Sequence, residues 1–128
     1  MWYNQRDKLE IVERKVQIRG GDFMRWFELF FLLVVGGIFF SLGWKIWKKK
    51  KISLIHDYHY KKVKDIDIKA YTAQIGKSHL IIGTGIILTG IIDFFTDTLF
   101  GWWVCGLTFC IGLVMIIHAQ IKYNHGIF

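Results

Sequence analysis

Two histidines in the middle of the chain, His56 and His59, stand three positions apart, with Asp57 directly after the first. Residues three apart share one face of a helix, so both imidazoles would point towards a single metal ion. Two histidines do not complete a site, and the third ligand would have to be Asp57 or His79. The alternative, which we favour, places these rings at a lipid headgroup boundary with their polar edges in water. We therefore predict no metal site.

Asp93 and His118 are two further ionisable side chains whose positions suggest chemistry, because each falls within or at the end of an apolar run. An aspartate in hydrocarbon costs about 2.5–3.5 kcal/mol on insertion scales, so Asp93 belongs either to a proton or ion path or to a membrane boundary. Asp97 follows four residues later and the turn there is short, which favours the boundary. His118 is expected at the opposite boundary, too far along its helix to meet Asp93.

Residue patterns typical of enzymes do not occur in the sequence. No nucleophile stands beside a base in a recognisable spacing, and there is no HExxH motif or paired carboxylate. Cys105 and Cys110 form no CxxC pair, and five helical steps place them about 140° apart, which disfavours a disulfide. The GTG segment at residues 83–85 is not a phosphate loop, because no strand precedes it and no Lys-Ser/Thr pair follows it in the required place. We expect neither catalysis nor a cofactor.

Three long apolar runs must position these side chains. Hydrophobic residues make up 53% of the 128 residues, and they gather in runs too long for the strands or amphipathic helices of a soluble domain. Aromatic residues flank the first run at both ends, as membrane interfaces favour. The sequence predicts an all-α integral membrane protein with three transmembrane helices, at residues 26–44, 79–95 and 102–119.

Positive charge is concentrated in the loop of residues 45–78. The chain has 17 Lys and Arg against 10 Asp and Glu, and ten lysines lie between Lys45 and Lys77. Such lysines are typical of cytoplasmic loops and attract anionic lipid headgroups; no motif accompanies them that would indicate nucleic acid as a partner. We expect membrane anchoring and lipid contact from Lys45, Lys48, Lys49, Lys50, Lys51, Lys61, Lys62 and Lys64.

The second half of this loop predicts a basic amphipathic helix on the cytoplasmic surface of the membrane. Ile68, Tyr71 and Ile75 are spaced by three and four, and Asp65 or Asp67 would be the N-cap. Because the lysines place the loop inside the cell, the N-terminus is expected outside and the C-terminus in the cytoplasm. The short turn between the second and third runs would then face outside.

Residues 1–23 contain five basic and four acidic side chains, and basic side chains outside the membrane oppose this topology. Gly20 and Gly21 could break a charged leader helix before the first span. Common codons for residues 19–24 can instead contain AGGAGG about seven nucleotides before an ATG, as a bacterial ribosome-binding site and start codon do. We therefore expect Met24 to be the natural start and residues 24–128 to form the membrane domain.

Small residues recur at spacings of four in each run, as in Gly37 and Ser41. Small side chains at this spacing let helix backbones approach closely in a membrane. We expect packing among the three helices, or with a partner, through Gly37, Ser41, Gly83, Gly85, Thr89, Gly106 and Cys110.

The run LIHDYHYKKVKDIDIKAYTAQIGK, residues 54–77, is followed by a glycine-rich span that ends in an aspartate, GTGIILTGIIDF. Together these segments resemble the small membrane proteins of Gram-positive bacteria classified as domain-of-unknown-function family 3784. The resemblance covers the chain from Met24 to the C-terminus, and residues 56–76 are its most specific part. It implies a bacterial cytoplasmic membrane and a start at the first span, and it supplies no catalytic residues.

Two hypotheses about function follow. In the first, the protein is a small membrane-embedded accessory or protective protein, for example in toxin immunity or transporter modulation, that acts through helix packing and its basic lipid-facing loop. Its partners would be anionic lipid headgroups and another membrane protein or a second copy of the chain. In the second, an oligomer translocates ions or protons through Asp93, since three helices alone enclose no pore.

Overall fold

A computed structural model describes residues 4–49 and 63–125 of the chain, and within these ranges the protein is all-α. Helix α1 spans Gln5–Lys49, α2 spans Ile68–Thr96 and α3 spans Gly101–Tyr123, with a short 3₁₀ helix, η3, at Asp65–Asp67. Each long helix contains a stretch that is long and apolar enough to cross a membrane. A helix satisfies its backbone hydrogen bonds internally, as lipid requires. The predicted all-α, three-span membrane protein is confirmed.

Helix α1 extends well beyond the predicted first span at both ends. It runs without interruption through Gly20 and Gly21, so the helix break considered for this glycine pair does not occur. Glycine in a helix costs only about 1 kcal/mol relative to alanine, which the favourable residues on either side can offset. That residues 1–23 precede the natural start stays a prediction.

The basic amphipathic helix expected in the loop is not a separate element. Residues from Ile68 onward are helical as predicted, but the helix continues directly into the second span as α2. Asp67 occupies the N-cap position, and its side chain makes no capping hydrogen bond. Tyr71 and Ile75, expected to lie on the membrane surface, are buried against the other helices. The contacts of the two side chains therefore lie within the protein.

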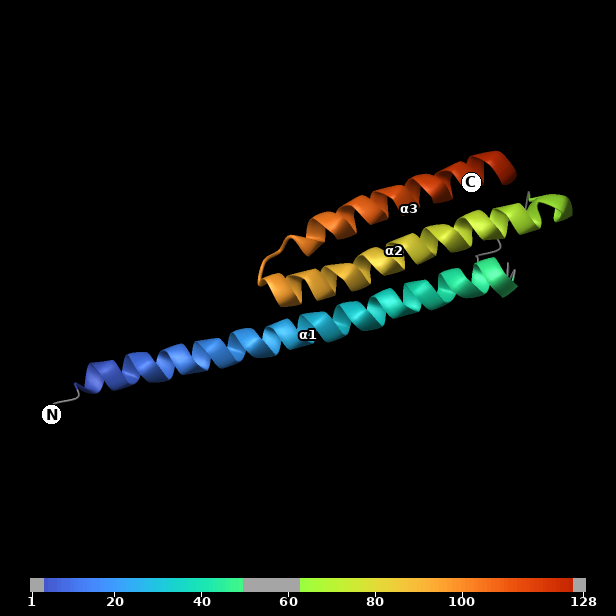
Figure 1. Cartoon of the computed structure of the whole chain (residues 1–128). Helices are drawn as coiled ribbons and strands as arrows, with labels where there is room; N and C mark the ends of the chain where they lie inside the picture. The colour runs from blue at the N-terminus through green and yellow to red at the C-terminus, as the bar shows by residue number, and fades with distance from the viewer. Residues whose placement is uncertain (1–3, 50–62, 126–128) are drawn as a thin grey trace.

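Helix α2 lies between α1 and α3 (Figure 1) and packs against both of them, while α1 and α3 have almost no contact with each other. Neighbouring helices run antiparallel. We call the end that carries the α2–α3 connection, residues 97–100, the turn end. The opposite end, where α1 finishes at Lys45–Lys49, is the lysine end. The first part of α1 projects past the turn end, away from the other two helices (Figure 1).

The most continuous cluster of buried apolar side chains lies at the lysine end. Ile46 of α1, Tyr71 and Ile75 of α2, and Ala119 of α3 form this cluster. Elsewhere, many large apolar side chains of α1 and α3 point away from the protein, including Phe30, Trp103 and Val114. Such exposure suits a protein whose outer surface faces lipid, where apolar side chains need no burial.

Candidate functional site

Glycines on both helices form the seam between α1 and α2. A Cβ atom added to Gly83 would lie 2.8 Å from the carbonyl oxygen of Gly36, and one added to Gly76 would lie 2.7 Å from the carbonyl oxygen of Gly43. Real Cβ atoms do not come this close, so the backbones touch only because these positions lack side chains. Gly90, seven residues after Gly83, faces Leu32 in the same seam.

The opposite face of α2 packs against α3. Gly85 lies directly against the side chain of Thr108, and Gly112 of α3 lies against Ile82. Gly83 and Gly85 are two residues apart, which is about 200° around a helix, so they serve opposite faces. The GTG segment therefore lets α2 approach a helix on each side.

The predicted packing residues divide into two groups. Gly83, Gly85 and Thr89 are buried between helices. By contrast, no atom of residues 4–49 or 63–125 lies within 4 Å of a Cβ added at Gly37 or Gly106, and their companions Ser41 and Cys110 are exposed. The structure brings these outward-facing residues against no other helix of the described chain. Packing with a partner stays a prediction for them.

At the turn end, the Asp93 carboxylate holds the start of α3. Its Oδ1 atom accepts a hydrogen bond of 2.6 Å from the backbone N–H of Gly101, the first residue of that helix. The backbone carbonyl oxygen of Asp93 accepts a hydrogen bond from the N–H of Asp97, a residue in the left-handed region with a φ of 54°. The side chain is 5% exposed, and among the described residues its Oδ2 atom has no hydrogen-bond partner.

Thr89 and Arg25 complete the contacts at this end. The Thr89 hydroxyl donates a 2.9 Å hydrogen bond to the carbonyl oxygen of Gly101. A Cβ at Gly101 would lie 2.6 Å from the Thr89 carbonyl oxygen, so α3 can start here only with glycine. Arg25 of α1 donates to the Phe94 carbonyl oxygen, and its Nε lies 3.4 Å from Asp97 Oδ1. Gly101 and Arg25 could not be predicted as contact residues from the sequence, because their partners come from other helices.

Polar side chains also join α2 to α3 towards the lysine end. The Nδ1 atom of His118 lies 2.8 Å from the Gln74 amide nitrogen, which also donates to the carbonyl oxygen of Met115. Gln120 is buried and donates a 2.9 Å hydrogen bond to the Tyr71 hydroxyl. His118 is exposed and lies far from Asp93, which is at the turn end. Gln120 was not predicted as a contact residue, and the sequence signal for it is an amide at the end of an apolar run.

The described lysines of the expected anchoring group are all exposed: Lys45, Lys48, Lys49 and Lys64. The ammonium group of Lys48 lies 4.0 Å from the centroid of the Trp47 ring and 5.6 Å from that of Trp44. The ammonium of Lys77, on α2, lies 5.2 Å from the same Trp47 ring. Tryptophan faces attract cations, so these two lysines are held on aromatic surfaces.

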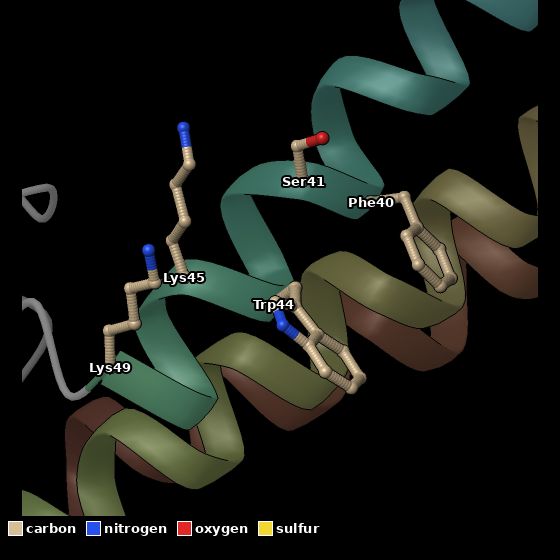
Figure 2. Close-up of a pocket in the computed structure, with 5 residues that line it drawn as sticks. All are labelled: Phe40, Ser41, Trp44, Lys45 and Lys49. Carbon is tan, nitrogen blue, oxygen red and sulfur yellow. The ribbon is translucent and has the colours of Figure 1, made fainter.

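An open groove lies on the outward face of α1 at the lysine end (Figure 2). It has a volume of about 460 Å³ and is lined by Phe40, Ser41, Trp44, Lys45 and Lys49. Figure 2 shows the Ser41 hydroxyl and the two lysine chains on one side of the helix, with the two aromatic rings on the adjacent side. A polar row and an aromatic row therefore run side by side along the helix axis.

Several predicted residues lie outside the described residues, namely Lys50, Lys51, Lys61, Lys62, His56, Asp57 and His59. Within residues 4–49 and 63–125, no three His, Cys, Asp or Glu side chains are grouped so as to hold a metal ion. The histidine-based metal hypothesis and the headgroup alternative both stay predictions.

Comparison with protein families identifies the family to which the chain belongs. The family model described as Domain of unknown function (DUF3784) matches residues 33–123. The match covers most of the chain, which therefore belongs to this family, as the resemblance of residues 54–77 and of the span after them indicated. No curated protein and no solved structure matches the chain significantly.

Proposed function

We propose that this DUF3784 protein is a small accessory or protective protein of a bacterial cytoplasmic membrane, for example in toxin immunity or transporter modulation. It would bind another membrane protein through the outward faces of α1 and α3. Its N-terminus would lie outside the cell, and the lysine end would contact anionic headgroups on the cytoplasmic side.

The observation that carries this proposal is the division of the small residues. The glycines of α2 lie in the seams within the chain, whereas Gly37 on α1 and Gly106 on α3 face outward with none of the described residues against them. In lipid, helices associate through close van der Waals contact, which small residues permit. An outward-facing small residue beside larger apolar ones therefore offers a partner helix a place to approach.

Ion or proton translocation through Asp93 is the competing function. The buried Oδ2 atom without a described partner is the feature that favours it. The other oxygen of the same carboxylate is engaged by the start of α3. If Asp93 carried protons, its carboxylate would have to release the Gly101 N–H or use Oδ2 alone. The hydrogen bond to Gly101 is by itself a sufficient structural reason for an aspartate at this position.

The first experiment distinguishes the accessory role from proton translocation, with purified protein. The protein would be reconstituted into liposomes that carry a pH gradient and an internal pH-sensitive dye. We expect no faster loss of the gradient than in empty liposomes. Loss that the Asp93→Asn variant abolishes would contradict the accessory role, because Asn keeps an acceptor for the Gly101 N–H but removes the charge.

The second experiment tests protection and partner binding in cells. A strain that lacks the gene would be challenged with pore-forming peptides and complemented with variants of matched membrane abundance. We expect Asp93→Asn to restore resistance and Gly106→Leu to fail, because leucine fills the approach position on α3. Val114→Leu, at an exposed position of the same helix that is not small, is the control and should restore resistance. Full resistance with Gly106→Leu would contradict binding through this face.

A further inference from the structure

The groove on α1 crosses the level at which a membrane changes from hydrocarbon to headgroup. Trp26 and Trp44 are separated along α1 by about 27 Å at 1.5 Å per residue, close to the hydrocarbon thickness of a bilayer of about 30 Å. Trp44 therefore lies at the boundary, as interfacial tryptophans do. Phe40 and Ser41 lie one turn deeper, and Lys45 and Lys49 lie at or beyond the boundary.

The two lysines of the groove differ from the lysines beside them. Lys48 and Lys77 rest on the faces of Trp44 and Trp47. In the part of the chain that the structure describes, Lys45 and Lys49 have no ion pair and no aromatic ring beneath them. They are one helical turn apart, so both ammonium groups can reach one anion.

We propose that this groove binds one phospholipid with an anionic headgroup. The phosphate would lie between Lys45 and Lys49, the Ser41 hydroxyl would donate to an oxygen of the lipid ester region, and an acyl chain would lie along Phe40 and Trp44. Along one helix the groove thus changes from two cations that have no ion pair among the described residues to two aromatic residues, Phe40 and Trp44, that are 42% and 47% exposed. An amphiphile with an anion directly before an apolar chain matches that order.

This occupant fits better than a soluble anion or an acidic partner. A free phosphate would pair with the lysines but would gain nothing from the aromatic row. A protein carboxylate would have to enter beside hydrocarbon, where its desolvation is costly. The inference deepens the headgroup contact of the proposed function, and its test uses lysine variants that leave the Gly106 face unchanged.

The experiment compares two double variants of the full chain by native mass spectrometry from detergent. The first double variant, Lys45→Gln with Lys49→Gln, removes the two lysines of the groove. The second, Lys48→Gln with Lys77→Gln, removes two lysines at the same end of the protein whose ammonium groups lie over the Trp47 ring. The probe is phosphatidylglycerol, with phosphatidylcholine as the zwitterionic comparison. We expect the first pair to weaken phosphatidylglycerol binding on the order of tenfold and the second by less than about threefold.

Two further measurements make the result specific. Ser41→Phe keeps both lysines but fills the groove, and we expect it to weaken phosphatidylglycerol binding as the groove pair does. Soluble glycerol phosphate should not displace the lipid, because it lacks the acyl chain. Equal losses from both lysine pairs, equal binding of phosphatidylcholine, or displacement by glycerol phosphate would each overturn the proposal.

Discussion

Helix α2 packs against α1 and against α3 through different kinds of residue. Against α1, glycine meets glycine, and the closest approaches join backbone to backbone at Gly36 and Gly83 and at Gly43 and Gly76. Against α3, polar side chains span the gap at both ends of the hairpin, from Asp93 at the turn end to Gln120 at the lysine end. Among the described residues, the seam with α1 has side-chain hydrogen bonding only from Arg25, at its turn end.

This difference shows two ways to assemble helices where the hydrophobic effect does not drive association. In lipid the remaining forces are close packing and hydrogen bonds between helices. The α1–α2 seam uses the first, so it should depend on side-chain size and hardly on polarity. The α2–α3 seam uses the second as well, so it should depend on whether each buried polar group keeps its partner.

The largest effect is expected from Gly36→Leu. A Cβ atom at this position would lie 2.6 Å from Ile87 Cγ1 and 2.9 Å from the Gly83 carbonyl oxygen, and backbone cannot move aside cheaply. Overpacking of this kind should lower the free energy of unfolding by about 3 kcal/mol. Thermal unfolding in detergent and protein abundance in membranes measure the effect.

Gly37→Leu is the matched control, because it adds the same side chain one residue away. No atom in the described part of the chain lies within 4 Å of a Cβ there, so the change in the free energy of unfolding should stay within about 0.5 kcal/mol. Equal destabilisation by the two variants would show that α1 and α2 do not pack through the Gly36 face. The pair therefore tests the α1–α2 seam by size alone.

Asp93→Ala should have the next largest effect, through the α2–α3 seam. It removes the acceptor for the Gly101 N–H and leaves that buried donor without a partner. Loss of a capping acceptor costs about 1–2 kcal/mol in the free energy of unfolding. Asp93→Asn keeps a side-chain oxygen in place and should cost less than half as much. If both variants were as stable as the wild type, hydrogen bonding at the turn end would not hold this seam.

The sequence predicts the three spans because lipid imposes length and apolarity on each helix separately. It does not predict which face of each helix meets a neighbour. Gly36 and Gly37 are adjacent and chemically identical, yet among the described helices only the first meets a neighbour, since the choice depends on the direction of α2. Gly85 and Thr89, spaced by four on α2, are buried, and α2 packs on two faces. The same spacing could not say which small residues of α1 face α2.

Other differences have a similar physical origin. The spacing of Ile68, Tyr71 and Ile75 does indicate an amphipathic helix, but an apolar face can be covered by lipid or by protein. Here Ile46 and Ala119 cover it, and both are distant in sequence. The short turn after Asp93 indicated that this residue lies near the end of its helix, and it lies in the last turn of α2. Its hydrogen bond to Gly101 could not be predicted, because it depends on the backbone conformation of the turn that joins α2 to α3.

The smallest effect is expected from Tyr71→Phe, at the lysine end of the α2–α3 seam. The change removes the hydroxyl that accepts a hydrogen bond from the Gln120 amide and keeps the ring. Side-chain hydrogen bonds between membrane helices average about 0.6 kcal/mol, because the separated helices find other partners. Thermal unfolding in detergent should show this small loss. Gln120→Leu removes the other partner, and the double variant should cost less than the sum of the two single changes, since one interaction is lost only once. Strictly additive losses would mean that the two side chains are not coupled, and that polar contact at this end does not distinguish the α2–α3 seam from the glycine seam with α1.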